Sequence, residues 1–389
     1  MLDCHVRYAD SNSTQSDESK MKRILAVLLA VFMLPIAPPL EARDTVCVVS
    51  SDSVPGVQQP QVAVNNAGHI FVAFGANENI FVCKSVDSGR TYSGPRKIGQ
   101  ASRLALGMRR GPRIVTHGDF VIVSAIGHDS GNLMAWRSED GGETWHDPAD
   151  VNDQPRSARE GLHDMAVGTD GLVFCAWLDL RSGSTQVFGA SSQDGGKSWS
   201  KNRLVYASPS GTVCECCHPS VAISNDGVVF VMWRNELDGN RDMYLAKSQN
   251  GGRTFGLADK LGVGSWKLKA CPMDGGDLAI GSGGSPITVW RRDRQVFATD
   301  QRASREMLLG LGEQPVVTTA DDGPYFVWLT RRTDDLFQSA LNTKTPTRLA
   351  RNASDPAIAA SRSGDGPVVA VWESGVKPKL SIMAAVIAE

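Results

Sequence analysis

The sequence predicts an all-β protein built from repeated pairs of strands. Four copies of one short motif begin at Ser85, Ser138, Ser192 and Ser248, so that successive copies lie 53, 54 and 56 residues apart. A near-constant period of this size is typical of repeat architectures. A second observation agrees with the first, because short runs rich in Val, Ile and Phe recur between turn residues and favour strands over helices.

Seven strand pairs are visible in the chain. The first strands are expected at residues 59–64, 111–116, 162–167, 218–223, 275–280, 314–319 and 355–360. Each leads through a short turn containing Gly or Asp into a second strand, expected at residues 69–75, 120–127, 172–179, 228–235, 286–293, 324–331 and 367–374. Repeated strand pairs that cannot bury their own faces predict a β-propeller.

Each repeat is long enough for a blade of four strands. Seven units share residues 43–389, or roughly 50 residues per blade, which predicts a seven-bladed propeller. The last unit ends after its third strand, and residues 44–52 are expected to supply the missing outer strand. Six blades are the alternative, if the short units that begin at residues 275 and 314 merge or lose strands.

The N-terminal region predicts export. Residues 21–42 have a basic start, an apolar stretch over residues 24–36 and the small residue Ala42 at a plausible cleavage point. This pattern is typical of a secretory signal peptide, and its apolar run is short for a membrane span, although an uncleaved anchor is the alternative. Residues 1–20 are expected to be a mis-called extension, and the mature chain, a single domain over residues 43–389, is expected to be periplasmic or secreted without a transmembrane span.

Charge and motifs exclude several classes of function. The formal net charge is -2 and the sequence pI is about 6.4, so the chain has no global attraction to nucleic acid or to acidic membranes. The sequence contains no phosphate-binding loop, no G-x-S-x-G nucleophile elbow and no dinucleotide fingerprint.

The repeated motif S-x-D-x-G-x-T-W resembles the Asp-box of bacterial neuraminidase repeats, which occurs in sialidases and in many non-catalytic propellers. The resemblance implies that each box is the turn between the third and fourth strands of a blade. In such a turn the acid accepts from backbone amides, glycine takes a positive φ and the aromatic residue packs into the blade. The predicted structural residues of blades 1–4 are Asp87, Asp140, Asp194 and Asn250.

The geometry of this family implies that one face of the propeller gathers the charged loops. Loops that enter the first strands and loops that leave the second strands lie opposite the Asp-boxes. The predicted ligand-binding residues of this rim are Arg109, His163, Asp164, Arg234, Glu236, Arg291 and Arg331. A small ligand at the central channel is expected there, since ligand sites are concave with a few convergent polar groups. Solvated surface charge is the alternative for each residue taken alone.

The cysteines suggest a more specific site. Cys214, Cys216, Cys217 and His218 lie within five residues, and Cys271 is in the corresponding loop of the next unit. Thiolates and imidazole are ligands suited to copper or zinc, so the leading hypothesis is a soft-metal site.

Two further interpretations of the same cysteines remain open. Disulfides such as Cys214–Cys271 and Cys47–Cys83 would suit an exported chain. The stretch also satisfies C-x-x-C-H, the attachment signature of covalent haem c. Seven cysteines remain after signal cleavage, so at least one stays unpaired in a monomer, and Cys175 in an apolar strand is the expected buried thiol.

The family resemblance also implies an enzymatic alternative, an exo-α-sialidase-like glycoside hydrolase. Sialidases bind the substrate carboxylate with three arginines and use a tyrosine nucleophile, a glutamate and an acid/base aspartate. The first arginine normally lies in an F/Y-R-I-P motif, but residues 56–64 read GVQQPQVAV here. No catalytic residue is therefore assigned. The metal-binding hypothesis also competes with a carbohydrate-binding propeller and with a non-catalytic assembly propeller that binds a protein partner.

Overall fold

The computed structural model describes residues 45–389 except 301–304, 342, 344 and 363–365. The predicted extension and signal peptide, residues 1–42, lie outside the described residues. One compact unit spans Ala42–Glu389. All elements in the described part of the chain are strands, as the sequence predicts, and none of its segments is a helix long and apolar enough to cross a membrane.

Five sheets have four antiparallel strands each, in chain order. The first sheet contains β2 (Val57–Val64), β3 (Ile70–Ala76), β4 (Asn79–Ser85) and β5 (Arg96–Gln100). The second contains β6 (Arg113–His117), β7 (Phe120–Gly127), β8 (Asn132–Ser138) and β9 (Ala149–Asp150). The third contains β10 (His163–Val167), β11 (Val173–Asp179), β12 (Gln186–Ser192) and β13 (Arg203–Tyr206). The fourth contains β14 (Ser220–Ile223), β15 (Val229–Arg234), β16 (Met243–Ser248) and β17 (Asp259–Lys260). The fifth contains β18 (Asp277–Ile280), β19 (Pro286–Arg292), β20 (Gln295–Asp300) and β21 (Met307–Leu311).

The remaining strands form one seven-stranded sheet in the order β1-β27-β26-β25-β24-β23-β22. Its strands are β22 (Glu313–Ala320), β23 (Gly323–Leu329), β24 (Asp334–Ala340), β25 (Thr347–Ala359), β26 (Val368–Val376), β27 (Lys379–Ala388) and β1 (Val46–Ser50). Residues 347–353 of β25 pair with β24, whereas residues 353–359 pair with β26. The long strand β25 therefore ends one group of four strands and begins the next.

The predicted strand pairs are all present. Each predicted first strand pairs antiparallel with the predicted second strand that follows it, from β2 with β3 to β25 with β26. Second strands such as β11 and β15 are buried along their whole length. Burial on both faces explains why these strands are nearly continuous apolar runs instead of alternating apolar and polar residues.

The Asp-boxes are the turns that the sequence predicts. In the second sheet the box connects β8 to β9, the third and fourth strands. Asp140 Oδ1 accepts hydrogen bonds from Ser138 Oγ and from the backbone N–H of Thr144, both at 2.8 Å. Gly142 has φ +88° and donates its N–H to Ser138 Oγ at 2.8 Å. Asn250 accepts from the N–H of Thr254 at 3.0 Å, so the amide replaces the acid in the fourth box.

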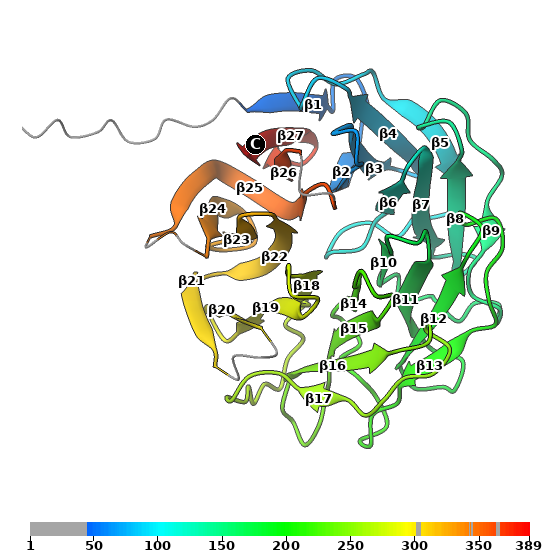
Figure 1. Cartoon of the computed structure of the whole chain (residues 1–389), viewed down its shortest axis with the longest axis vertical. Coiled ribbons are helices and arrows are strands. Elements are labelled where there is room, and N and C mark those ends of the chain that lie inside the picture. Colours follow the sequence, from blue (N-terminus) through cyan, green and yellow to red (C-terminus); the bar gives the residue numbers. More distant parts are fainter. Residues whose placement is uncertain (1–44, 301–304, 342, 344, 363–365) are drawn as a thin grey trace, which may run out of the picture. The chain divides into compact units, whose positions relative to one another are not determined.

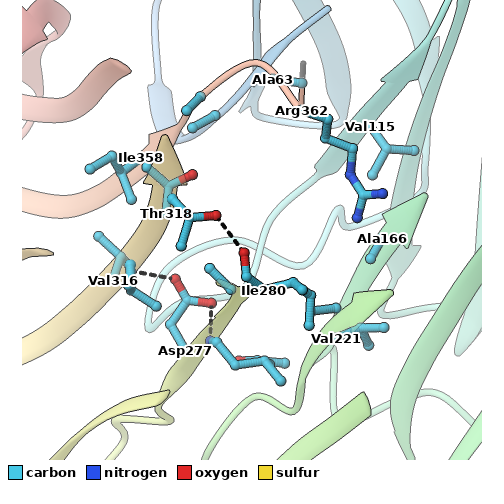
Figure 2. Close-up of a pocket in the computed structure, with 18 of the residues that line it drawn as sticks. Ala63, Val115, Ala166, Val221, Asp277, Ile280, Val316, Thr318, Ile358 and Arg362 are labelled. Carbon is cyan, nitrogen blue, oxygen red and sulfur yellow. Dashed lines mark hydrogen bonds between the residues drawn. The ribbon is translucent and has the colours of Figure 1, made fainter. Parts of the chain in front are cut away.

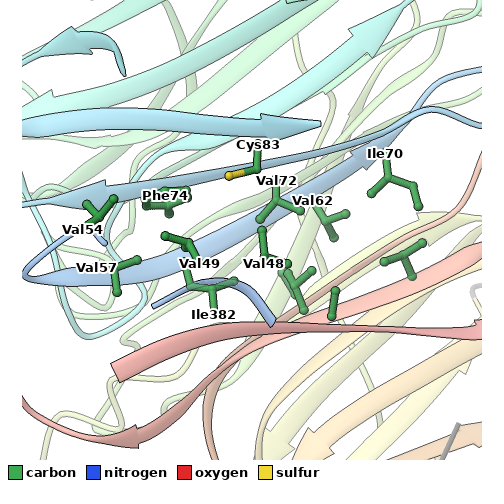
Figure 3. Packing of buried hydrophobic residues seen from close by; sticks show 14 of the residues in the cluster. Val48, Val49, Val54, Val57, Val62, Ile70, Val72, Phe74, Cys83 and Ile382 are labelled. Atoms are coloured by element: carbon green, nitrogen blue, oxygen red, sulfur yellow. The ribbon is translucent and has the colours of Figure 1, made fainter. Parts of the chain in front are cut away.

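The two ends of the described chain meet in one hydrophobic cluster. Val48 and Val49 of β1 pack with residues of β2, β3 and β4 and with Ile382 of β27 (Figure 3). β1 also pairs with β27, beginning at Val46 and Ala384, as predicted for residues 44–52. The N-terminal strand is therefore hydrogen-bonded to the last sheet of the chain and packs by apolar contact against the first.

The sheets of residues 45–389 follow one another around a common centre (Figure 1). The innermost strands are β2, β6, β10, β14, β18, β22 and the second part of β25. Each inner strand contacts the next one along the chain, and β25 contacts β2. Antiparallel sheets arranged radially with their first strands innermost are the architecture of a β-propeller.

Candidate functional site

The inner strands enclose a central channel of about 500 Å³ (Figure 2). The third residues of the predicted first strands lie at equivalent positions along it: Gln61, Arg113, Asp164, Ser220, Asp277, Val316 and Ala357. Two residues further on come Ala63, Val115, Ala166, Ala222, Ala279, Thr318 and Ala359. Residues two apart in a strand point to the same side, so the channel has a polar layer above a layer of small side chains.

Buried acids hold the polar layer together. Asp164 Oδ2 accepts the N–H of Val221 at 2.8 Å, and Asp277 Oδ2 accepts the N–H of Val317 at 2.9 Å. Each acid thus binds the inner strand of the following sheet. Burial raises the pKa of Asp164, and burial together with the nearby charge of Asp164 raises the pKa of Asp277 to about 7.

Arg113 is the cation of this layer. Its Nε lies 3.6 Å from Asp164 Oδ1, and its Nη2 donates to the carbonyl of Arg109 at 2.7 Å. The side chain is buried, and this burial lowers its pKa to about 10. Arg113 and Asp277 were not among the predicted site residues. The aligned first strands did carry the signal, since the third position of three of them holds a charged residue: Arg113, Asp164 and Asp277.

Arg109 extends across one end of the channel. Its Nη1 donates to the carbonyl of Pro356 at 2.7 Å, which lies 247 residues away in the chain. Met108 and Arg109 have φ values of +57° and +64°, so two consecutive non-glycine residues take the left-handed conformation. Such residues carry backbone strain and tend to occur at ligand sites and switch regions.

Several buried polar atoms near this end have no hydrogen-bond partner among the described residues. They are Gln59 Nε2, Arg109 Nε, His163 Nδ1, His218 Nδ1, Asp274 Oδ1 and Gln314 Oε1. All belong to inner strands or to the segments that enter them. Buried polar groups are nearly always hydrogen-bonded to protein, water or ligand, and this set contains both donors and acceptors.

The opposite end of the channel is crossed by Arg362 (Figure 2). Its Nη2 donates to the carbonyl of Ile223 at 2.8 Å. Solvent in the channel reaches the side chain, yet protein surrounds it closely enough for burial to lower its pKa. Each end of the channel therefore carries an arginine.

Among the predicted rim residues, Arg109 and Asp164 line the channel. His163 is buried beside it, with Nε2 2.9 Å from Ser124 Oγ, and burial lowers its pKa. Arg331 is exposed.

The remaining predicted rim residues take part in local contacts instead. Arg234 is buried and donates to three backbone carbonyls, those of Asp274, Arg241 and Arg291. Arg291 pairs with Glu313 at 2.5 Å. Glu236 accepts the N–H of Gly239 at 3.0 Å. These contacts hold loops in place, so the structure does not bring Arg234, Arg291 and Glu236 to the channel.

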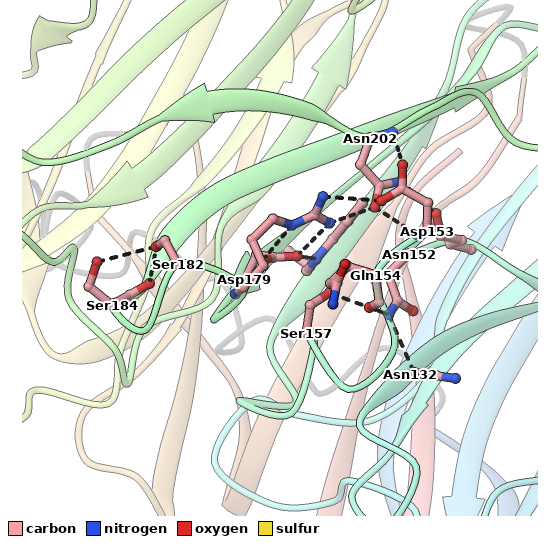
Figure 4. A network of polar contacts seen from close by, with 12 residues as sticks. Asn132, Asn152, Asp153, Gln154, Ser157, Asp179, Ser182, Ser184 and Asn202 are labelled. Atoms are coloured by element: carbon pink, nitrogen blue, oxygen red, sulfur yellow. Dashed lines mark hydrogen bonds and ion pairs between the residues drawn. The ribbon is translucent and has the colours of Figure 1, made fainter.

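A separate polar network joins the second and third sheets (Figure 4). Arg181 binds both carboxylate oxygens of the buried Asp179, at 2.8 and 3.0 Å, and also reaches Asp153 and Asn202. Trp177 Nε1 donates to Asp179 Oδ2 at 2.7 Å. A buried carboxylate with a bidentate arginine and an indole donor is a stabilising arrangement.

Three of the five predicted metal ligands form a compact thiol cluster. The Sγ atoms of Cys214 and Cys217 are 3.3 Å apart, and Cys216 Sγ lies 3.7 and 3.9 Å from them. The three ligand atoms lie within 4.8 Å of one another. His218 does not join them, because its side chain turns into the channel. Cys271 stands outside the cluster, where its thiol interacts with that of Cys216.

The cluster favours one thiolate. Hydrogen bonds from Cys216 and Cys217 lower the pKa of Cys214, with help from Arg234 and Arg241, while burial raises the pKa of Cys217. The structure contains neither of the two suggested disulfides, since all seven cysteines in the described ranges are free thiols. Cys214 turns toward Cys217 instead of Cys271, and Cys175 is buried as predicted.

Comparisons with known proteins bear on the fold. Residues 119–280 match the family described as BNR repeat-like domain. A protein of unknown function from Dyadobacter fermentans is similar with a TM-score of 0.51 and 16% identity, over 90% of this chain and 100% of that chain. A Hadza microbial sialidase has a TM-score of 0.48 and 13% identity, over 87% of this chain and 67% of that one. The sialidase of Trypanosoma rangeli in complex with sialic acid has a TM-score of 0.48 and 14% identity, over 86% of this chain and 55% of that one. No curated protein sequence matches the chain.

The matched residues contain the second, third and fourth Asp-boxes, and the first box has the same contacts at Asp87. The strand order, the position of the boxes and the domain match agree with one another. Residues 119–280 are therefore similar to BNR repeat-like domains, and the first Asp-box shows that the same turn also occurs outside the matched residues.

Proposed function

We propose that this chain is an exported seven-bladed propeller that binds a carbohydrate in its central channel. The supporting observation is that two residues lining the polar end of the channel carry buried polar atoms without a hydrogen-bond partner among the described residues, Arg109 Nε and His218 Nδ1. A sugar presents hydroxyl groups that both donate and accept, so it matches a wall with unpaired donors and unpaired acceptors. A cavity of about 500 Å³ lies in the usual range for small-molecule sites.

The lining favours binding over hydrolysis. No tyrosine and no glutamate is among the described residues that line the channel. The four described tyrosines have different surroundings: Tyr92 packs in the hydrophobic cluster of the chain ends, Tyr206 and Tyr244 lie against Trp233, and Tyr325 binds Asp322. The nucleophile pair of sialidases thus has no counterpart in the channel. Binding without turnover is the function that we infer.

Seven blades are the count that best explains the sheets. The seven-stranded sheet divides at β25 into two groups of four, which share that strand. Seven inner segments line the same channel. With β1 as the last strand of the final group, every blade has four strands.

Saturation-transfer NMR on the mature chain tests carbohydrate binding. The probes are N-acetylneuraminic acid, galacturonic acid, galactose and N-acetylglucosamine, each offered separately. We expect saturation transfer to at least one sugar, and its loss in Ala166→Met, which places a long side chain in the narrow layer of the channel. Ala67→Met, in the exposed turn between β2 and β3, is the control and should bind like the wild type.

Two results would contradict the carbohydrate proposal. One is the absence of saturation transfer from the folded wild type to all four sugars. The other is binding that persists unchanged in Ala166→Met while thermal unfolding shows the variant to be intact.

The thiol cluster supports a second candidate function, binding of a soft metal ion. The observation that favours it is the convergence of three Sγ atoms within 4.8 Å. Three thiolates suit trigonal Cu(I), while Zn²⁺ would need a fourth ligand such as water. The ligands would be Cys214, Cys216 and Cys217.

Metal analysis of reduced protein tests this candidate. The mature chain is incubated anaerobically with Cu(I) or Zn²⁺, desalted and measured by elemental mass spectrometry. We expect about one ion per chain, lost in Cys217→Ser and kept in Cys47→Ser, which changes an exposed cysteine outside the cluster. Retention of the ion in Cys217→Ser would exclude the cluster as its site. Stoichiometric iron in the purified native protein would instead support the covalent haem hypothesis.

A further inference from the structure

Four thiols from the entry loops of the fourth and fifth sheets range from exposed to buried. Cys271 is exposed, Cys216 is half-buried, and Cys214 and Cys217 are inaccessible to solvent. Cys271 lies near enough to Cys216 for that thiol to raise its pKa, and Cys216 Sγ lies 3.7 Å from Cys214 Sγ and 3.9 Å from Cys217 Sγ. The series ends at the pair Cys214–Cys217, whose sulfurs are 3.3 Å apart.

We propose that these thiols form a disulfide relay, in which Cys271 and Cys216 pass oxidising equivalents from an external disulfide to the buried pair Cys214–Cys217. This inference is independent of the ligand in the channel. It rests on two features together: Cys216 Sγ lies within 4 Å of both buried sulfurs, and only Cys271 and Cys216 are accessible to a partner. A buried dithiol without an accessible neighbour could not exchange with a disulfide in solution, because exchange requires contact between the attacking sulfur and the sulfur attacked.

The exchange steps balance without a further oxidant. The Cys271 thiolate attacks an external disulfide R–S–S–R′, forms a mixed disulfide with R–S and releases R′–S⁻, which takes a proton. Cys216 attacks Cys271 Sγ and releases R–S⁻, giving the disulfide Cys216–Cys271. Cys214 then attacks Cys216 Sγ and frees Cys271, and Cys217 attacks Cys214 Sγ and frees Cys216. In sum, two buried thiols are oxidised to one disulfide, and the external disulfide is reduced to two thiols.

The loop is built to hold the buried pair in position. The N–H of Cys214 donates to the carbonyl of Arg234 at 3.1 Å, and the N–H of Val213 donates to the carbonyl of Thr185 at 3.0 Å. A disulfide has its sulfurs about 2.05 Å apart, so the pair needs a relative shift of only about 1.3 Å to close.

Peptide mapping distinguishes the two disulfides of the relay. Cleavage after arginine and lysine leaves Cys214, Cys216 and Cys217 in one peptide, residues 204–234, and Cys271 in another, residues 270–291. The intermediate Cys216–Cys271 therefore links two peptides, whereas the product Cys214–Cys217 stays in one peptide that lacks two thiol hydrogens. Reduced, chelator-treated mature protein is mixed with glutathione disulfide, quenched with acid at intervals and mapped.

We expect the linked peptides to rise and then fall as the single oxidised peptide accumulates. In Cys271→Ser, oxidation of the buried pair should slow at least about tenfold, since the accessible first thiol is missing. Cys47→Ser removes the second exposed cysteine and should oxidise at the wild-type rate. Both changes are on the surface, so folding is retained.

Three outcomes would overturn the relay. One is oxidation of the buried pair in Cys271→Ser as fast as in the wild type. The others are linked peptides that persist as the final product, or an internal disulfide that joins Cys214 to Cys216 instead of Cys217. Each of these leaves the carbohydrate and metal measurements unaffected.

Discussion

Asp277 offers a direct test of how the channel is stabilised. Its side chain is half-buried in the channel wall, accepts the N–H groups of Leu278 and Val317 at 2.9 Å, and has a pKa of about 7 in the folded chain against 3.8 for the free side chain. A carboxyl group with a raised pKa in the folded state binds its proton more tightly there than in the unfolded state. Its contribution to stability is therefore present at low pH and is lost as the pH rises through about 7.

The size of this loss follows from the two pKa values. One pKa unit corresponds to about 1.4 kcal/mol, so the interval from pH 5 to pH 7 costs about 2.3 kcal/mol, and the loss reaches about 2.7 kcal/mol by pH 8. Asn cannot ionise, so Asp277→Asn should remove this part of the pH dependence. Acids that do not interact with Asp277 titrate alike in both proteins and cancel when the two are compared, whereas Asp164 also responds to the substitution because its charge acts on Asp277.

Urea unfolding followed by tryptophan fluorescence measures the effect at pH 5 and pH 8. The wild type should lose about 2.7 kcal/mol more free energy of unfolding between these two pH values than Asp277→Asn does. Asp259→Asn changes an exposed acid on β17 and should keep the wild-type dependence. If Asp277→Asn loses as much stability with rising pH as the wild type, Asp277 is not the titrating group.

Three further substitutions test contacts between sheets, one of them, Gly227→Ala, as a control. Gly252→Ala would place its Cβ 2.1 Å from Phe174 Cε2 at a φ of +83°, so we expect a loss of about 2–4 kcal/mol in urea unfolding. Gly227→Ala, with a similar φ of +78° and open space around its Cβ, should cost only about 1 kcal/mol. Arg181→Ala leaves the buried carboxylate of Asp179 without its counter-ion and should cost about 3 kcal/mol, measured in the same way.

Equal costs for the two glycine substitutions would show that backbone conformation alone matters at these turns. For Arg181→Ala, a loss below about 1 kcal/mol would mean that the indole of Trp177 and the backbone N–H of residue 181 suffice for Asp179.

The strands and turns were predictable because their determinants are local. Apolar runs bounded by Gly and Asp specify strands such as β11 and β15 wherever they occur in the chain. The Asp-box turns likewise depend on contacts within about six residues, from Ser138 to Thr144. Even the pairing of β1 with the last sheet was foreseeable, because the final repeat lacked one strand.

The candidate sites depended on contacts that only the folded chain creates. Arg113, Asp164 and Asp277 lie far apart in sequence, and seven inner strands must meet in register before these residues share one layer. His218 was grouped with the cysteines by its position in the sequence. It lines the channel instead, because it begins the approach to an inner strand while the preceding cysteines remain in the loop outside. The sequence thus determined the strands, the turns and the contacts within each Asp-box. Tertiary structure decided which charged and thiol groups converge, because their convergence depends on distances between segments that no local pattern encodes.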